Sequence, residues 1–195
     1  MKLILASASP RRSALLRQVG IPHSVIASDV QEERRPEHLS PAETALYLAL
    51  QKARRVAAGL GEGLVLGADT IVVHRGELLG KPASPEEARR MLHHLSGEQH
   101  SVITGLALVD AKTGREESAY EETRVWMRVL GEELIDAYVA TGEPMDKAGA
   151  YAIQGKAALF VKKIEGCYFN VVGLPLFQLS LLLSRMDIKP WSGWR

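Results

Sequence analysis

The sequence has one cysteine, no long apolar run and almost no net charge. The single Cys167 excludes an internal disulfide framework and a cysteine-based zinc site. No apolar stretch approaches the roughly 20 residues that cross a bilayer, and Ser, Pro and Arg follow the first apolar run too early for a signal peptide. A net charge of +1 provides no overall field for nucleic acid or anionic membranes. We therefore expect a soluble cytoplasmic protein with no nucleic-acid or membrane partner.

Several catalytic motifs are also missing. The sequence contains no G-x-x-x-x-G-K-[ST] loop and no G-x-S-x-G nucleophile elbow. Its six histidines show no spacing with acids or cysteines that is typical of a metal site. A nucleophilic mechanism is therefore disfavoured, and water activated by a carboxylate or a metal is the chemistry that the remaining residues favour.

Strands and helices are predicted to alternate along the chain. Apolar and amphipathic patterns predict a mixed α/β protein in which both helices and tight turns join the strands. The predicted strands cover 3–6, 23–27, 63–80 with an interruption at Gly-Ala-Asp-Thr, 100–110, 118–130 and, as a pair, 158–173. The predicted helices cover 10–20, 40–59, 84–97, 131–142 and 174–186, with a charged surface loop at 28–40.

Three helices begin with Ser-Pro, and the first differs from the others. In two of them the third helical residue is an acid, Glu43 or Glu87, as capping and the helix dipole favour. In the first, Ser9 is the expected N-cap and Arg11 and Arg12 occupy the positive end. The pair indicates either a phosphate cradle at the helix start or two side chains that extend into solvent.

Acids and lysines elsewhere are candidates for a phosphate or metal site. Asp69 breaks an apolar strand, where a carboxylate either caps a turn or projects into a cleft. Its small neighbours Gly67 and Ala68 leave room for a ligand to approach the backbone. Glu32 or Glu33 in the charged loop could join it on a hydrated Mg²⁺. Lys81 lies in a Gly-Pro loop, and Lys52 lies on a helix where it either reaches an anion or faces solvent.

The segment from Thr141 to Gly155 has neither a helical nor a strand period. Such irregular stretches in compact domains are more often functional than idle. The Gln154 amide offers a donor and an acceptor that suit the edge of a nucleobase. Asp146 and Lys147 either pair with each other or contact a ligand.

These segments together resemble the Maf family of nucleoside triphosphate pyrophosphatases, in particular its dTTP/UTP branch. The resemblance runs from Leu3 to the last helix and rests on the order of "LASASPRR", "QKA", "GADTIV", "GKP", "LSGEQHSVITG", "TGEPMDKAGAYAIQG" and "VVGLPL". It implies an inosine triphosphatase-like fold, in which helices surround a mixed, elongated sheet and two lobes flank a cleft. We expect one such domain over residues 1–195.

The resemblance also implies roles for individual residues. Nucleoside triphosphate and water would give the monophosphate and pyrophosphate, with a divalent cation, Mg²⁺ or Mn²⁺, and a homodimer is implied. Gln31 stands where many members have an acid, which puts a two-carboxylate metal site at the loop in doubt. The implied roles are water activation and metal binding for Asp69, metal binding for Glu32, base selection for Arg11, Thr70 and Gln154, and other substrate contacts for Ser7, Arg12, Lys52 and Lys81.

Two other functions stay open at this point. A nucleotide-binding regulator of cell division would use the same binding residues without hydrolysis, although such a protein could dispense with Asp69. The 7-methyl-GTP branch of the family differs at the specificity positions near Gln154. A nucleic-acid-binding module is the weakest alternative, because basic and aromatic residues do not interleave on any predicted surface.

Overall fold

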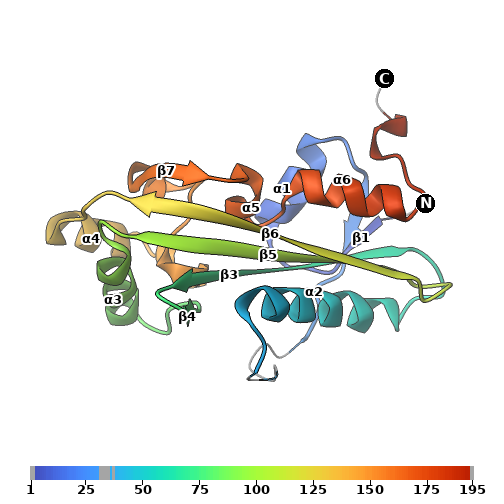
Figure 1. The fold of residues 1–195 in the computed structure, drawn as a ribbon, viewed down its shortest axis with the longest axis horizontal. Helices are drawn as coiled ribbons and strands as arrows, with labels where there is room; N and C mark the ends of the chain where they lie inside the picture. The colour runs from blue at the N-terminus through green and yellow to red at the C-terminus, as the bar shows by residue number, and fades with distance from the viewer. Residues whose placement is uncertain (1–2, 31–35, 37, 194–195) are drawn as a thin grey trace. The chain divides into compact units, whose positions relative to one another are not determined.

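The fold combines a mixed β-sheet with α-helices and short 3-10 helices (Figure 1). The computed structural model describes residues 3–30, 36 and 38–193. Within these ranges seven strands form one sheet in the order β2-β1-β3-β5-β6-β7, and β4 pairs with β3. The strands are β1 (Leu3–Leu5), β2 (His23–Val25), β3 (Leu64–His74), β4 (Glu77–Leu79), β5 (Gln99–Asp110), β6 (Glu116–Met127) and β7 (Val161–Glu165).

The sheet combines both strand directions, as the sequence predicts. β1 runs parallel to β2 and to β3, whereas β4 is antiparallel to β3 and β7 is antiparallel to β6. The helices are α1 (Pro10–Gln18), α2 (Pro41–Ala57), α3 (Pro85–Leu95), α4 (Glu132–Val139), α5 (Tyr168–Val172) and α6 (Leu176–Arg185). Short 3-10 helices are η2 (Glu143–Asp146), η3 (Ala148–Ala150), η4 (Lys156–Leu159) and η5 (Pro190–Gly193). Among the helices of the described ranges, none is long and apolar enough to span a membrane.

The chain divides into two compact units. The first comprises Met1–Asp69, Thr104–Glu121 and Gly173–Arg195, and the second comprises Thr70–Ile103 and Glu122–Val172. The strands β3, β5 and β6 each continue from one unit into the other.

In the first unit, helices cover both faces of the sheet. α1 and α6 lie on one face and α2 on the other (Figure 1). α2 begins with the predicted capping box, in which Ser40 Oγ accepts from the Glu43 N–H and Glu43 Oε2 accepts from the Ser40 N–H. Its alanines pack on the sheet with Ile4 and Val65 in a buried apolar cluster. An ordinary amphipathic helix therefore forms this layer.

Two glycines let α2 approach the sheet backbone closely. A Cβ on Gly67 of β3 would lie 2.0 Å from the Ala49 carbonyl oxygen, and one on Gly105 of β5 would lie 2.3 Å from that of Ala45. Neither distance is compatible with a side chain. The small residues near Asp69 therefore make room for a helix at Gly67, and the expectation that this space admits a ligand to the backbone is wrong there.

The second unit has its own core, which helices α3 and α4 and the following segments form. Leu92, Leu95, Ile135 and Phe160 are fully buried in one cluster. The Tyr138 ring meets the Phe160 ring edge to face, with centroids 4.9 Å apart. This packing anchors the end of α4 and the start of the irregular segment that follows it.

Two predicted strands differ from the observed ones. β3 runs uninterrupted through the Gly-Ala-Asp-Thr sequence, so Asp69 lies within a strand. The pair of strands predicted for 158–173 is wrong in its second half, where α5 follows β7. Gly166 at φ 127° breaks the strand, and Asn170 Nδ2 then donates to the Val102 carbonyl at 2.9 Å. A stretch of five mostly apolar residues does not distinguish a strand from a short helix, and the buried Asn170 side chain decides for the helix here.

The buried His100 in the second unit makes the fold sensitive to acid. Its Nε2 lies 2.7 Å from the Tyr151 hydroxyl, and the residue is 2% exposed. Burial, with a smaller contribution from the nearby His74, lowers the pKa of His100 from 6.5 to about 4. His100 therefore stays neutral in the fold at a pH where the unfolded chain takes up a proton.

We expect the free energy of unfolding to decrease as the pH falls from 6.5 to 4. Unfolding takes up a proton on His100 across this window, which corresponds to a loss of up to about 3 kcal/mol. Urea unfolding of the wild type and of His100→Gln at several pH values would measure this pH dependence of the free energy of unfolding. The variant should show a shallower pH dependence, and equal slopes for the two proteins would contradict the prediction.

Candidate active site

The first unit reverses its strand order beside β1. From β1 the chain passes through α1 to β2 on one side, and α2 then leads to β3 on the other side. The parallel pairing of Leu5 with Leu66 is extended by the Ala6 N–H, which donates to the Leu66 carbonyl at 2.8 Å. Ser7 therefore lies just after the carboxyl end of β1, and Asp69 lies on β3 shortly beyond Leu66, the last residue of β3 that pairs with β1. This switch point is where open α/β sheets bind ligands.

The start of α1 differs from those of α2 and α3. Ser9 occupies the predicted N-cap position, but within the described residues its hydroxyl makes no capping hydrogen bond and the first turn has no acid. In α3 the Ser84 hydroxyl accepts from the Glu87 N–H at 3.2 Å, as Ser40 does for Glu43 in α2. Backbone donors in the first turn of a helix lack intrahelical partners and suit a bound anion. α1 thus has the start that an anion site requires.

Arg12 folds back onto the loop that precedes α1. Its Nε donates to the Gly173 carbonyl at 2.8 Å, and its Nη1 donates to Ser7 Oγ at 2.9 Å. The Ser7 hydroxyl is buried and also accepts from the Ser9 N–H at 3.2 Å. The alternative in which both arginines extend into solvent is therefore wrong for Arg12. Arg11 is half-buried.

Asp69 and Lys52 form a buried ion pair. Lys52 Nζ lies 2.5 Å from Asp69 Oδ1, and the residues are 8% and 5% exposed. Lys52 reaches the carboxylate because α2 lies directly on β3 at Gly67. Of the alternatives open for Lys52, the surface position is wrong. Asp69 does not cap a turn, because it lies within β3.

The remaining predicted residues are distributed over the second unit and the charged loop. Thr70 is half-buried on β3, Lys81 is exposed after β4, and Gln154 is exposed in a turn. Each of these three belongs to the second unit. The structure brings together Ser7 with Arg12 and Lys52 with Asp69, both within the first unit.

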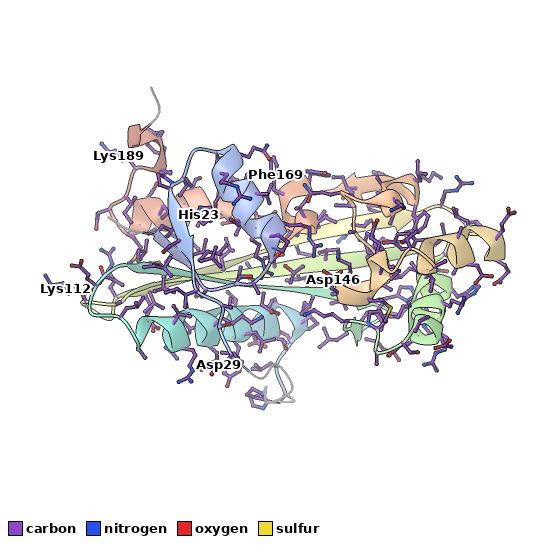
Figure 2. The ribbon with its side chains drawn as sticks, turned by 180° about the vertical axis from the view of Figure 1, so that it is seen from behind. His23, Asp29, Lys112, Asp146, Phe169 and Lys189 are labelled. Carbon is purple, nitrogen blue, oxygen red and sulfur yellow. The ribbon has the colours of Figure 1, made fainter. Side chains whose placement is uncertain are left out.

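Glu32 and its neighbour Gln31 lie outside the described residues. Just before them, Asp29 lies near α2 (Figure 2). Two hydrogen bonds of 2.7 and 2.9 Å join its carboxylate to the Arg55 guanidinium. This contact lowers the pKa of Asp29 to about 2. The start of the charged loop is therefore attached to α2 through the contact between Asp29 and Arg55.

In the segment from Thr141 to Gly155, Asp146 and Lys147 form an ion pair with each other. Lys147 is mostly buried, whereas the Asp146 side chain is 71% exposed. Of the two alternatives for this pair, mutual pairing is the one that the structure contains.

One contributor was missed from the sequence. Gly173 supplies the carbonyl that holds Arg12, and its φ of 117° favours glycine. The glycine before Leu-Pro in "VVGLPL" was its only sequence signal. The backbone carbonyl of Gly173 thus orients the Arg12 side chain, although Gly173 is far from Arg12 in the sequence.

The described residues offer limited ligation for a metal ion. Among them no group of three or more His, Cys, Asp or Glu residues could hold one. Asp69 supplies a hard carboxylate oxygen, and Mg²⁺ on a polyphosphate typically needs only one or two carboxylates with water and phosphate oxygens. The donor chemistry of Asp69 therefore fits a substrate-bound divalent cation.

Comparison with known proteins identifies the family. Residues 2–186 match the family model described as Maf-like protein. The chain belongs to the Maf family. Curated Maf relatives include the dTTP/UTP pyrophosphatase of Moorella thermoacetica, 55% identical over 97% of both chains. The dTTP/UTP pyrophosphatase of Methanosarcina barkeri is 52% identical over 96% of this chain and 95% of its own.

Solved structures show that this Maf protein shares its fold with more distant proteins. A HAM1 protein from Coxiella burnetii aligns with a TM-score of 0.53 at 18% identity, covering 95% of this chain and 99% of its own. The Ham1 protein of Staphylococcus aureus aligns with a TM-score of 0.52 at 13% identity, covering 95% and 100%. The predicted fold class, a mixed α/β sheet of the inosine triphosphatase-like type, is confirmed.

Proposed function

We propose that this Maf protein hydrolyses dTTP and UTP to the monophosphate and pyrophosphate. The observation that carries the proposal is the similarity over nearly the full length to dTTP/UTP pyrophosphatases, at 55% identity for that of Moorella thermoacetica. The geometry of the first unit supports it. The buried pair of Asp69 on β3 and Lys52 on α2 belongs to the same unit as the arginine-rich start of α1, which follows β1 at the switch point of the parallel strands, where a nucleotide phosphate chain can be bound.

In the proposed reaction Asp69 acts as the general base. Its carboxylate takes a proton from water while the water oxygen bonds to the α-phosphorus. The bond from that phosphorus to the bridging oxygen breaks, and pyrophosphate leaves with the electron pair. Lys52, 2.5 Å from Asp69 Oδ1, balances the charge of the carboxylate and holds it in place. Arg12 and Lys81 contact the phosphates, and the Ser7 hydroxyl orients Arg12.

The proposal includes a divalent cation, Mg²⁺ or Mn²⁺. Asp69 and Glu32 would hold it. When bound, such an ion withdraws charge from the phosphate oxygens and lowers the pKa of bound water. Base selection is assigned to Arg11, Thr70 and Gln154. A cytoplasmic location and a homodimer belong to the same proposal.

A panel of nucleotides with pyrophosphate detection tests this function. We expect turnover of dTTP and UTP that EDTA abolishes and added Mg²⁺ or Mn²⁺ restores. Turnover of 7-methyl-GTP without dTTP or UTP would contradict the branch assignment. Nucleotide binding without any turnover would favour the regulator of cell division.

The two arginines of α1 should have separable effects. Arg12→Ala removes a cation that Ser7 and Gly173 orient, so kcat/KM should fall by about tenfold or more for every nucleotide alike. Arg11→Ala should instead change the ratio of kcat/KM between pyrimidine and purine nucleotides. Steady-state kinetics with dTTP, UTP and dATP measure both effects.

Arg17→Ala is the matched control for charge on this helix. Arg17 lies in the last turn and donates to Ser13 Oγ. The Arg17→Ala variant should leave kcat/KM, and its ratio between pyrimidine and purine nucleotides, near the wild-type values. Identical selectivity changes in the Arg11 and Arg12 variants would show that their roles are not separate.

A further inference from the structure

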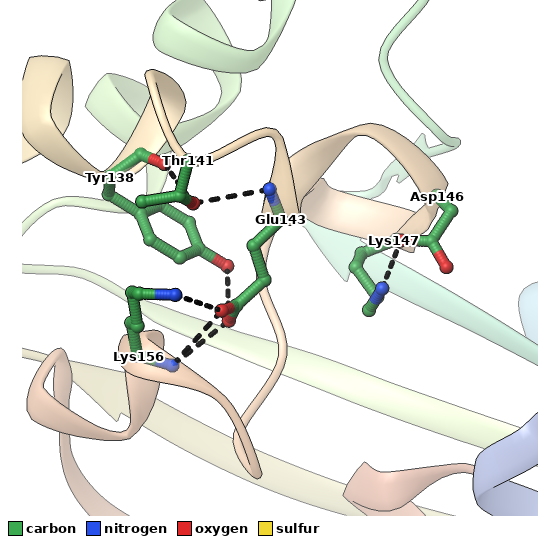
Figure 3. A network of polar contacts seen from close by, with 6 residues as sticks. All are labelled: Tyr138, Thr141, Glu143, Asp146, Lys147 and Lys156. Carbon is green, nitrogen blue, oxygen red and sulfur yellow. Dashed lines mark hydrogen bonds and ion pairs between the residues drawn. The ribbon is translucent and has the colours of Figure 1, made fainter.

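One carboxylate, that of Glu143, holds the backbone of the turn that carries Gln154. The Gly155 N–H donates to the Ala152 carbonyl at 3.0 Å, which closes a turn over Ile153 and Gln154. Glu143 Oε1 then accepts the next backbone N–H, that of Lys156, at 3.0 Å, and Oε2 lies 3.3 Å from the same nitrogen. Both oxygens thus contact the backbone two residues after Gln154 (Figure 3).

Further contacts fix the Glu143 carboxylate. The Tyr138 hydroxyl donates to Oε1 at 3.2 Å, and Lys156 Nζ lies 3.7 Å from Oε2. Burial, and the nearby Glu143 carboxylate, raise the pKa of Tyr138, so its hydroxyl remains a donor. The Glu143 side chain is only 19% exposed. A charged acceptor with this many donors is held more firmly than a surface carboxylate.

The backbone of Glu143 is fixed as well. Its N–H donates to Thr141 Oγ1 at 3.2 Å, and that hydroxyl donates to the Tyr138 carbonyl at 2.7 Å. Gly142 turns the chain between them at a φ of 73°. Glu143 is therefore attached to the end of α4, whose Tyr138 ring packs in the core of the second unit.

A side chain at position 155 would displace the Glu143 carboxylate from its contact with the turn. A Cβ on Gly155 would lie 1.9 Å from Glu143 Oε1. The glycine after Gln154 therefore allows the carboxylate to reach the backbone of the turn. The contacts connect α4, the carboxylate and the turn in a chain that ends beside Gln154.

We infer that Glu143 is a positioning residue for base selection, which holds the Gln154 turn in the arrangement that meets the pyrimidine base. This inference rests on the proposed function and deepens it. Glu143 does not touch substrate and acts through Gln154. Without Glu143 the turn would sample more conformations, and an ordered amide would no longer be presented to the base.

The test compares Glu143→Ala, Glu143→Gln, Gln154→Ala and the double variant Glu143→Ala with Gln154→Ala. Glu143→Ala should raise KM for dTTP and UTP by about tenfold, change kcat less, and reduce discrimination against dATP. Glu143→Gln keeps an oxygen for the Lys156 N–H and should recover most of the discrimination. The double variant should match Gln154→Ala, because Glu143 acts only through that side chain.

Glu133→Ala, an exposed acid on α4, is the control for loss of charge in the same unit. Unchanged discrimination in Glu143→Ala, or additive losses in the double variant, would overturn the inference. A wild type without pyrophosphate release would overturn the proposed function separately. Calorimetric binding of dTTP then decides the inference, since Glu143→Ala must weaken binding and the double variant must bind as weakly as Gln154→Ala, and further weakening in the double variant would overturn it.

Discussion

Replacing Asp69 with Asn is expected to reduce pyrophosphate release from dTTP by 10²- to 10⁴-fold, about the range that a general base contributes. The amide has no charge with which to accept the proton of water. The same change removes the Asp69 carboxylate from the buried ion pair with Lys52, whose ammonium is 2.5 Å away. Breaking a buried ion pair by removing one of its charges costs about 3 kcal/mol. We therefore expect Asp69→Asn to lower the free energy of unfolding as well as the rate.

The double variant Asp69→Asn with Lys52→Met separates the two effects. Removing both charges of the pair eliminates the broken buried ion pair, so much of the stability should return while activity stays as low as in the single variant. Pyrophosphate release and urea unfolding of the three proteins measure this. Wild-type activity in Asp69→Asn would exclude Asp69 as the base. Recovered activity in the double variant would show that the single variant failed because it was unstable.

Replacing Gly67 with Ala should destabilise the first unit by about 3 kcal/mol or more, at the upper end for overpacked cores. The new methyl group would lie 2.0 Å from the Ala49 carbonyl oxygen and 2.9 Å from the Ala53 nitrogen. Both are backbone atoms, so relief requires α2 to move away from β3. Lys52 lies between Ala49 and Ala53 in the sequence of α2. A shift of α2 should therefore disturb the contact of Lys52 with Asp69, and activity should fall.

Gly61→Ala is the matched control for this prediction. Gly61 is exposed, and its added Cβ would meet nothing within 4 Å. Its stability should stay within about 0.5 kcal/mol of the wild type. Thermal unfolding followed by circular dichroism compares the two variants. Equal melting temperatures for Gly67→Ala and the wild type would contradict the close approach of α2 to the sheet.

Local signals in the sequence were strong where short-range contacts decide the structure. The capping box of Ser40 and Glu43 and the Ser-Pro starts of α1, α2 and α3 are formed by residues a few positions apart. The mixed sheet was also predictable, because helical and tight-turn connections imply different strand directions. The Asp146–Lys147 ion pair was one of two alternatives in the sequence, because the two residues are adjacent and their contact is local.

The site residues were predictable as residue types and through the Maf resemblance, but their contacts were not. Lys52 and Asp69 are 17 positions apart, and their contact depends on how closely α2 packs on β3. Arg12 and Gly173 are 161 positions apart. No periodicity in the sequence reports the distance between a helix and a strand, because packing of residues far apart in the chain determines it.

By itself, then, the sequence determined the helix starts, the fold class and the family, all of which depend on local patterns or on a series of motifs. Only the tertiary structure decided that Arg12 folds back, that β3 continues through Asp69, and that α5 replaces a strand. It also decided that Glu143 holds the turn of Gln154. In each case a buried or half-buried polar group must find a partner, and that partner is supplied by another part of the fold.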